Sequence, residues 1–221
     1  MDITKFAILK KLAGGGGGGG DHADEDAIVS RTITEYTNDR VTSIGQSAFR
    51  YCFALITVDF SQATSIGEHA FDRCSNLTSV DFPAATSIEG SAFEYCSNLT
   101  SVDFPAATSI GQSALFSCSN LTSVDFPAAT SIKGGALAYC RKLTSLILRV
   151  TTQVCTLSNT NAFDSTPIKS GTGYIYVPAA LVDSYKTATN WTTYANQFRA
   201  LESYTVDGTT TGELDPTKVN A

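Results

Sequence analysis

A fourteen-residue segment occurs three times without a change, and it constrains the fold more than any other feature of the chain. SNLTSVDFPAATSI occupies residues 75–88, 97–110 and 119–132. The copies begin 22 residues apart, and three columns of residues extend this period to five units. The columns are Ile44, Ile66, Ile88, Ile110 and Ile132; Cys52, Cys74, Cys96, Cys118 and Cys140; and Leu55, Leu77, Leu99, Leu121 and Leu143. A fixed period of this length predicts a solenoid, in which each unit forms one coil stacked on the next.

Each unit contains one short strand and one turn segment. The letters SVDF, residues 79–82, alternate between polar and apolar, which is the pattern of a half-buried strand. Pro83 ends this strand because proline has no backbone N–H to give to the ladder. The segment GSAFEYC, residues 90–96, is too short for a standard α-helix. We expect it to form a helical or 3₁₀ turn that returns the chain to the next strand.

Stacking explains why the apolar letters repeat so faithfully. Successive coils lie about 4.8 Å apart, so each apolar side chain lies over its own kind in the next coil. Burying four such side chains contributes roughly 6–12 kcal/mol per coil before conformational entropy is counted, so no coil is stable alone. Core packing does not explain the identical exposed residues, such as Thr78 and Ser79. Recent duplication is the simpler explanation for those.

The full pattern resembles a known family. LTSVDFP–x–A–TSIG–x–x–AF–x–x–C–x–x–L is similar to the BspA-like, Treponema-type leucine-rich repeat, and the resemblance covers residues 41–150 as five 22-residue repeats. It implies a leucine-rich-repeat β-solenoid with parallel strands and short helical or 3₁₀ turns. It also implies adhesion or protein binding, as in surface and secreted proteins of bacteria and some protists. The chain departs from the family in its unit length, since 23 residues is the commoner repeat.

The segments outside the repeats differ in composition. Residues 1–13 do not resemble a signal peptide, because their basic residues lie among and after the apolar ones. We expect them to be a docking peptide, because a flexible glycine run joins this short segment to the rest of the chain. Residues 14–20 are a glycine linker, and residues 21–40 are expected to form an N-terminal β cap. Residues 151–202 are predicted to hold a degenerate repeat and a small helical C-terminal cap that closes the core. Residues 203–221 are polar and are predicted to be a flexible tail.

The cysteines do not match a metal site or a catalytic site. Zinc sites use paired thiolates a few residues apart, and a catalytic cysteine needs a nearby base, although the chain has only His22 and His69. Stacked cysteines about 4.8 Å apart are compatible with disulfides, but five ladder positions cannot all pair. The resemblance implies that this cysteine is a small buried hydrophobe. We therefore expect free buried thiols in the ladder and expect Cys155, outside it, to be the most accessible.

Two columns of polar or amphipathic residues are candidates for binding. Aspartates recur on the exposed side of the strands, and neighbouring charges at this spacing repel by about 1 kcal/mol in water. This column is either a solvated polar face or a stripe that receives a cation or a basic partner. Calcium needs six or more converging oxygens, which a straight column supplies poorly, so no metal is predicted. The members are Asp59, Asp81, Asp103 and Asp125.

A second candidate column lies among the variable positions before each cysteine. Tyr51, Tyr95 and Tyr139 recur in alternate units, and Phe116 lies near them in the sequence pattern. Tyrosine is a favoured contact residue in interfaces because it is apolar with a polar tip. The alternative is that these surface positions vary because nothing constrains them.

Charge and motifs exclude several function classes. The net charge of −6 and the pI near 4.8 argue against nucleic acid and anionic membranes as partners. No apolar run approaches the roughly 18 residues that a spanning helix needs. P-loop, nucleophile-elbow, metalloprotease and Rossmann patterns do not occur, and we expect no deep cleft, no cofactor and no enzyme activity.

Two functional hypotheses follow. The leading one is a non-catalytic binding or adhesion module that presents a solenoid face to a protein or glycan at an extracellular cell surface. The alternative is a phage virion or tail-associated protein, structural or in contact with the host, that is anchored through residues 1–13.

Overall fold

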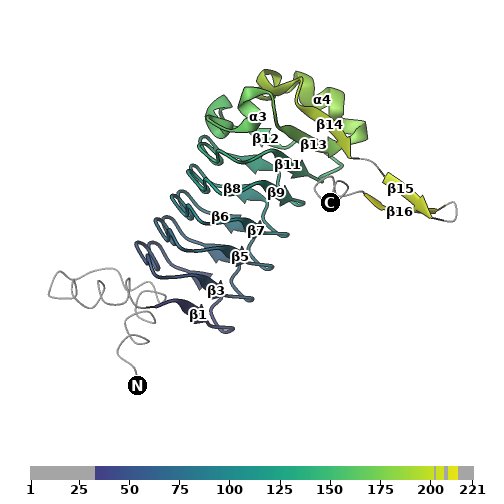
Figure 1. The fold of residues 1–221 in the computed structure, drawn as a ribbon. Helices are drawn as coiled ribbons and strands as arrows, with labels where there is room; N and C mark the ends of the chain where they lie inside the picture. The colour runs from purple at the N-terminus through teal and green to yellow at the C-terminus, as the bar shows by residue number, and fades with distance from the viewer. Residues whose placement is uncertain (1–32, 202, 207–208, 214–221) are drawn as a thin grey trace.

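Each repeat of the sequence becomes one coil of a solenoid (Figure 1). This computed structural model describes residues 33–201, 203–206 and 209–213. The docking peptide expected at 1–13, the linker at 14–20 and residues 21–32 of the expected β cap lie outside the described residues. We number the coils by the isoleucine column, from Ile44 in the first to Ile132 in the fifth. Leu157 pairs with Ile132 and marks a sixth coil.

One sheet runs the length of the solenoid. It contains six parallel two-residue strands in the order β12-β10-β8-β6-β4-β2. Like residues pair with like, so that Ile66 lies beside Ile88 and Ile88 beside Ile110. The strands are β2 (Ser43–Ile44), β4 (Ser65–Ile66), β6 (Ser87–Ile88), β8 (Ser109–Ile110), β10 (Ser131–Ile132) and β12 (Thr156–Leu157).

The strands predicted from the SVDF pattern form a second parallel face in three registered groups. The groups are β1-β3, β5-β7 and β14-β13-β11-β9, and β3 lies beside β5 as β7 lies beside β9. Val80 pairs with Val102 and Asp81 with Asp103, which confirms the predicted stacking of parallel strands. The strands are β1 (Glu35–Thr37), β3 (Thr57–Asp59), β5 (Ser79–Asp81), β7 (Ser101–Asp103), β9 (Ser123–Phe126), β11 (Ser145–Leu148), β13 (Tyr174–Pro178) and β14 (Phe198–Leu201).

Columns of identical side chains fill the interior between these faces. Leu77, Leu99 and Leu121 are completely buried. The rings of Phe71 and Phe93 are stacked, with centroids 5.1 Å apart and planes 2° from parallel. Such close packing makes each coil depend on both of its neighbours, because no coil can bury its own apolar residues alone.

The turn segments close each coil on the side not covered by the two sets of strands. Each turn segment of the kind at residues 90–96 contains two left-handed residues. Ala92 N–H donates to the carbonyl of Glu89, in a 3₁₀-type bond, whereas Phe93 N–H donates to Ala114 in the next coil. Ser91 and Tyr95 have φ angles of 53° and 58°. These left-handed residues interrupt the expected 3₁₀ turn, so that alternate N–H groups point along the solenoid axis and join one coil to the next.

Threonine hydroxyls add hydrogen bonds between coils. Thr86 and Thr108 each donate to the threonine carbonyl 22 residues earlier, over 3.2 Å. Thr78 donates to the carbonyl of Ile56 over 3.3 Å. Duplication alone is therefore an incomplete explanation for the repeated surface threonines, because their hydroxyls bond the preceding coil. The sequence pattern did not reveal these bonds, since the threonines are solvent-facing and carry no apolar periodicity.

All six cysteines are buried, and none forms a disulfide. The thiols of Cys74 and Cys96 donate to the carbonyls of Phe49 and Phe71 in the preceding coil. The expectation that Cys155 is accessible is wrong, because Cys155 is completely buried. Burial raises its pKa to about 12, so this thiol is not ionised near neutral pH.

A helical cap covers the C-terminal end of the core. Trp191, Tyr185, Tyr194 and Phe163 pack against one another there. The Trp191 indole N–H donates to the carbonyl of Cys155 over 2.6 Å, which ties the cap to the solenoid. The helical segments are η1 (Thr160–Phe163), α3 (Pro167–Ser170), η2 (Ala179–Leu181), α4 (Val182–Thr187) and η3 (Trp191–Tyr194).

A hairpin follows the cap. Strands β15 (Ser203–Val206) and β16 (Thr209–Glu213) pair antiparallel (Figure 1). The sequence predicts a flexible tail over 203–221 and does not indicate these strands, because the segment is polar and has no apolar alternation.

Candidate functional site

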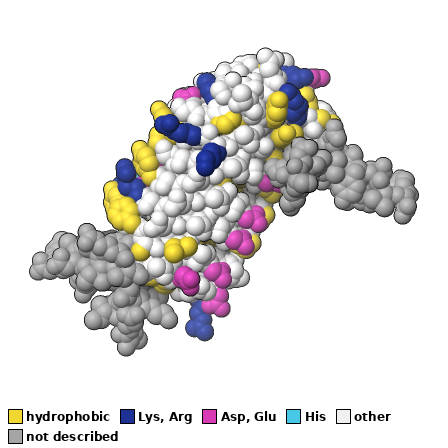
Figure 2. Space-filling view, in the orientation of Figure 1, with side chains coloured by type: hydrophobic (Ala, Val, Ile, Leu, Met, Phe, Trp, Pro, Cys, Tyr) yellow, Lys and Arg dark blue, Asp and Glu magenta, His cyan; other side chains and the backbone are white. Residues whose placement is uncertain are grey.

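The strand face places the aspartates in one acidic column. Asp59, Asp81 and Asp103 are exposed, and Asp125 is half-buried. Partial burial, followed by the charges of Asp81 and Asp125, raises the pKa of Asp103 above its usual 3.8. Figure 2 shows acidic side chains gathered on one flank of the molecule. The structure therefore brings these residues together as the period predicts, and burial and repulsion together disfavour the charged form of Asp103.

An arginine ends the acidic column. The Arg149 Nε lies 2.8 Å from Oδ2 of Asp125, and its Nη2 lies 2.8 Å from the same oxygen. Beyond Asp125 the column continues with Ile147, which pairs with it across the ladder. Repulsion is thus relieved at this end, and the acidic column is limited to four coils.

The tyrosine column occupies an unusual backbone conformation. Tyr51, Tyr95 and Tyr139 have φ angles of 62°, 58° and 62°, and Ser117 has the same conformation at 59°. Bulky residues rarely adopt positive φ, which costs roughly 1 kcal/mol or more per residue. Because serine fits this position in the fourth coil, the backbone does not require tyrosine.

The tyrosines belong to an aromatic stripe, which we define as Tyr51, Arg73, Tyr95, Phe116 and Tyr139. The Arg73 guanidinium lies over the Tyr95 ring, 4.2 Å from its centroid. The Phe116 ring lies 5.6 Å from that of Tyr95 and 5.0 Å from that of Tyr139. Tyr51 and Tyr139 remain 40% and 39% exposed. Hydrophobic and basic side chains run along one edge of the molecule in Figure 2, opposite the acidic flank.

A buried carboxylate fixes the basic members of this edge. Asp72 is only 2% exposed, and Arg50 Nε lies 2.9 Å from its Oδ2. Arg73 Nε lies 3.9 Å from Oδ1, and the Arg50 guanidinium lies 4.8 Å above the Tyr51 ring. Asp72 was not among the residues singled out from the sequence. Its signal was an acid one period after Arg50 in the same column, where opposite charges on neighbouring coils can pair.

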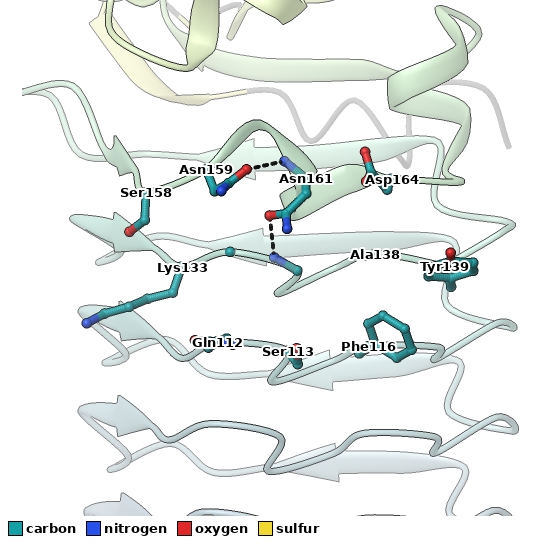
Figure 3. A pocket seen from close by; sticks show the side chains of 12 residues that line it. Gln112, Ser113, Phe116, Lys133, Ala138, Tyr139, Ser158, Asn159, Asn161 and Asp164 are labelled. Carbon is teal, nitrogen blue, oxygen red and sulfur yellow. Dashed lines mark hydrogen bonds between the residues drawn. The ribbon is translucent and has the colours of Figure 1, made fainter.

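The structure contains a pocket that the sequence analysis did not expect. The Gly134 pocket has a volume of about 420 Å³ and lies on the turn segments of the fourth to sixth coils (Figure 3). The sequence pattern predicts no deep cleft and does not reveal this pocket, which is open to solvent on the turn side of the coils. This volume lies within the usual range for small-molecule sites. The lining is Gln112, Ser113, Phe116, Lys133, Gly134, Gly135, Ala138, Tyr139, Ser158, Asn159, Asn161 and Asp164.

Two searches of the described residues gave negative results. No group of three or more His, Cys, Asp or Glu side chains among them is placed to hold a metal ion. No helix within the described ranges is long and apolar enough to cross a membrane.

Comparison with solved structures places the chain among leucine-rich repeat proteins. The crystal structure of the Treponema pallidum leucine-rich repeat protein is 30% identical, with a TM-score of 0.51, and covers 52% of this chain. A leucine-rich cell surface protein from Faecalibacterium prausnitzii is 22% identical, with a TM-score of 0.49 and 77% of this chain covered. The chain spans 59% and 52% of the lengths of these two proteins. No curated protein matches this sequence.

Comparison with protein families gives a clearer result. The family described as "BspA type Leucine rich repeat region" matches residues 42–169 in six copies. This match covers more than half of the chain and includes the degenerate sixth coil. The chain belongs to the BspA-type leucine-rich repeat family.

Proposed function

We propose that this chain is a non-catalytic binding module that contacts a partner protein at an extracellular cell surface through the aromatic stripe. The observation that carries the proposal is the column of tyrosines at left-handed positions where serine also fits; Tyr51 and Tyr139 are exposed and Tyr95 is half-buried. Strained backbone positions are often retained at functional sites, and a tyrosine there gains no packing in the core. The family resemblance, which implies adhesion or protein binding, supports the same proposal.

The composition of the stripe suits protein recognition. Tyrosine and arginine are enriched among the residues that dominate binding energy, and both are present on a rigid coil. The stripe spans four coil spacings from Tyr51 to Tyr139, or about 19 Å at 4.8 Å per coil. Arg50 and Arg73 place two guanidinium groups on this edge, and Asp72 offsets part of their charge. The partner we propose therefore presents an apolar patch with acidic residues at its margin.

The acidic column has a different role in this proposal. We propose that Asp59, Asp81 and Asp103 form a solvated face that stays outside the contact. Two features support this. Partial burial, followed by the charges of Asp81 and Asp125, raises the pKa of Asp103. Arg149 already neutralises Asp125. A basic partner on this face remains the alternative hypothesis.

Replacing the tyrosines with serine tests the stripe without disturbing the backbone, because Ser117 already occupies the same column. We expect the triple variant Tyr51→Ser, Tyr95→Ser, Tyr139→Ser to fold normally and to bind cells at least tenfold more weakly. The measurement is flow cytometry of labelled full-length chain on bacterial and animal cells, before and after surface proteolysis. Proteolysis should abolish wild-type binding.

The matched control for this experiment is Tyr174→Ser, which removes an exposed tyrosine from the strand face. It should bind as the wild type does. Undiminished binding by the triple variant, or wild-type binding that survives proteolysis, would contradict the proposed protein contact.

Residues 1–13 support a second proposal, attachment to a larger assembly such as a phage virion. Its only support is in the sequence, where a run of seven glycines joins this peptide to the rest of the chain. A chain lacking residues 1–20 should keep its cell binding and lose incorporation into particles. Unchanged incorporation, measured by co-sedimentation with particles, would exclude this role.

A further inference from the structure

The Gly134 pocket exists because one coil lacks the side chains that its neighbours carry. Gly134, Gly135 and Ala138 of the fifth coil form its floor. The flanking coils carry larger residues at the matching positions, namely Gln112, Ser113 and Phe116 in the fourth and Asn159, Asn161 and Asp164 in the sixth. Backbone strain does not explain the glycine at 135. Its φ of 67° is close to that of Ser113, at 55°, in the same column.

One wall of the pocket is aromatic. Phe116 and Tyr139 lie with ring centroids 5.0 Å apart and planes inclined by 47°. Both side chains stand on the same side of the pocket in Figure 3. They offer an apolar surface against which a ligand ring can pack, while the Tyr139 side chain stays partly exposed to solvent.

The sixth coil carries two amides whose orientation is fixed. The Asn159 Oδ1 accepts the N–H of Asn161 over 3.0 Å, and the Asn161 Oδ1 accepts the N–H of Gly135 over 3.0 Å (Figure 3). Because both carbonyl oxygens are used by the backbone, both Nδ2 groups are left as donors. No residue in the described part of the chain accepts a hydrogen bond from either Nδ2.

The remaining polar groups supply acceptors and little net charge. Asp164 is half-buried, with its Oδ1 3.7 Å from the Nζ of Lys169, and Lys133 is exposed at the other end of the pocket. Gln112 adds a neutral amide. One acid and one base therefore line the pocket, together with neutral amides and hydroxyls.

We propose that the Gly134 pocket binds a terminal pyranose of a glycan. A pyranose has hydroxyl groups that both donate and accept hydrogen bonds, and an apolar face of C–H groups that packs on an aromatic ring. The two fixed amide donors and the Asp164 acceptor match its hydroxyls, and the aromatic wall matches its apolar face. Phosphorylated ligands would need more positive charge than Lys133 provides, and an apolar anchor would need an apolar lining.

This site is separate from the protein contact proposed above, although Phe116 and Tyr139 border both. The pocket requires the amides of the sixth coil, whereas the stripe begins at Tyr51 in the first coil, five coils away. The triple variant includes the shared Tyr139, so the single variants Tyr51→Ser for the stripe and Asn159→Asp for the pocket separate the failure of one proposal from the failure of the other.

The test uses saturation-transfer NMR on the full-length chain with methyl glycosides of glucose, galactose, mannose and N-acetylglucosamine. At least one should give a signal and a measurable Kd. Asn159→Asp retains the oxygen that accepts the Asn161 N–H but removes the donor, so the Kd should rise at least tenfold. Ala138→Glu introduces the residue found at Glu94 in the third coil and should fill the pocket, with the same result.

The control is Tyr51→Ser, which lies outside the pocket and should leave the Kd for the glycoside unchanged while it weakens binding to cells. Asn159→Asp should raise the Kd for the glycoside and leave binding to cells unchanged. The proposal is overturned if none of the four glycosides binds the wild-type chain. It is overturned equally if both pocket variants bind as the wild type does.

Discussion

At the scale of single residues, a different physical constraint acts on the residue type in each column. The Phe71 and Phe93 column is fixed by close packing in the interior, so its members cannot change independently. The column of Tyr51, Tyr95 and Tyr139 faces solvent and is not fixed by packing. The acidic column lies between these cases, because it is exposed but its members interact along the axis.

Asp103→Asn should stabilise the protein at neutral pH. The pKa of Asp103 is raised in the folded state, so ionisation costs stability; this cost is fully present above the raised pKa and vanishes below 3.8. Urea unfolding at several pH values should show a more stable variant at pH 7 and no difference at pH 3. Glu89→Gln, an exposed acid outside the column, is the control and should change little at either pH.

The residue types explain which features could be predicted from the sequence. Packing columns and the alignment of aspartates and tyrosines follow from the 22-residue period alone. The left-handed conformation of Tyr95 and Arg73 does not, because glycine and asparagine are the usual signals for positive φ. The buried Asp72 was equally hidden, since nothing in its neighbourhood along the chain distinguishes it from a surface acid.

At the scale of elements, the two sides of each coil bond in opposite directions. On the strand side, Thr86 N–H donates to the carbonyl of Thr64 in the preceding coil. On the turn side, Phe93 N–H donates to Ala114 in the following coil. Every internal coil is therefore joined to both neighbours by backbone bonds, and the threonine hydroxyls reinforce only the backward set.

Thr108→Val should reduce stability by roughly 0.5–1.5 kcal/mol, the usual net contribution of one hydrogen bond. Valine has nearly the shape of threonine but cannot donate to the carbonyl of Thr86. Thr108→Ser, which keeps the hydroxyl, is the matched control and should lose less. Equal losses for the two variants in chemical denaturation would show that the bond contributes nothing measurable.

At the scale of the whole molecule, the solenoid has unlike ends. Trp191, Tyr185 and Tyr194 close the C-terminal end, and the Tyr194 hydroxyl donates to the carbonyl of Thr160 in the sixth coil. The sequence indicated a closing segment here from its apolar anchors. The Gly134 pocket between this segment and the fourth coil was not predicted, because it depends on the sizes of side chains in three neighbouring coils and not on any single residue.

Trp191→Ala should destabilise the chain by about 3–5 kcal/mol, because it leaves a large cavity beneath the cap. The sixth and fifth coils should lose protection first, since each coil is held by its nearest neighbours. Hydrogen exchange measured for each coil should show the largest loss of amide protection in the sixth coil and smaller losses in coils farther from the cap. Trp191→Phe should cause a smaller loss in the same coils. Uniform loss of protection across all coils would contradict a solenoid governed by nearest-neighbour contacts.

The identical register of the coils has a consequence for how such a chain can vary in length. Adding one 22-residue cassette between the second and third coils would preserve every interior column and lengthen the molecule by about 4.8 Å. The aromatic stripe would lengthen with it, while the Gly134 pocket, lined only by the fourth to sixth coils of the present chain, would move along the axis unchanged. The length of the solenoid and its ligand specificity can therefore change independently. Small-angle scattering of the lengthened chain would measure its length, and its affinity for a glycoside would measure the pocket.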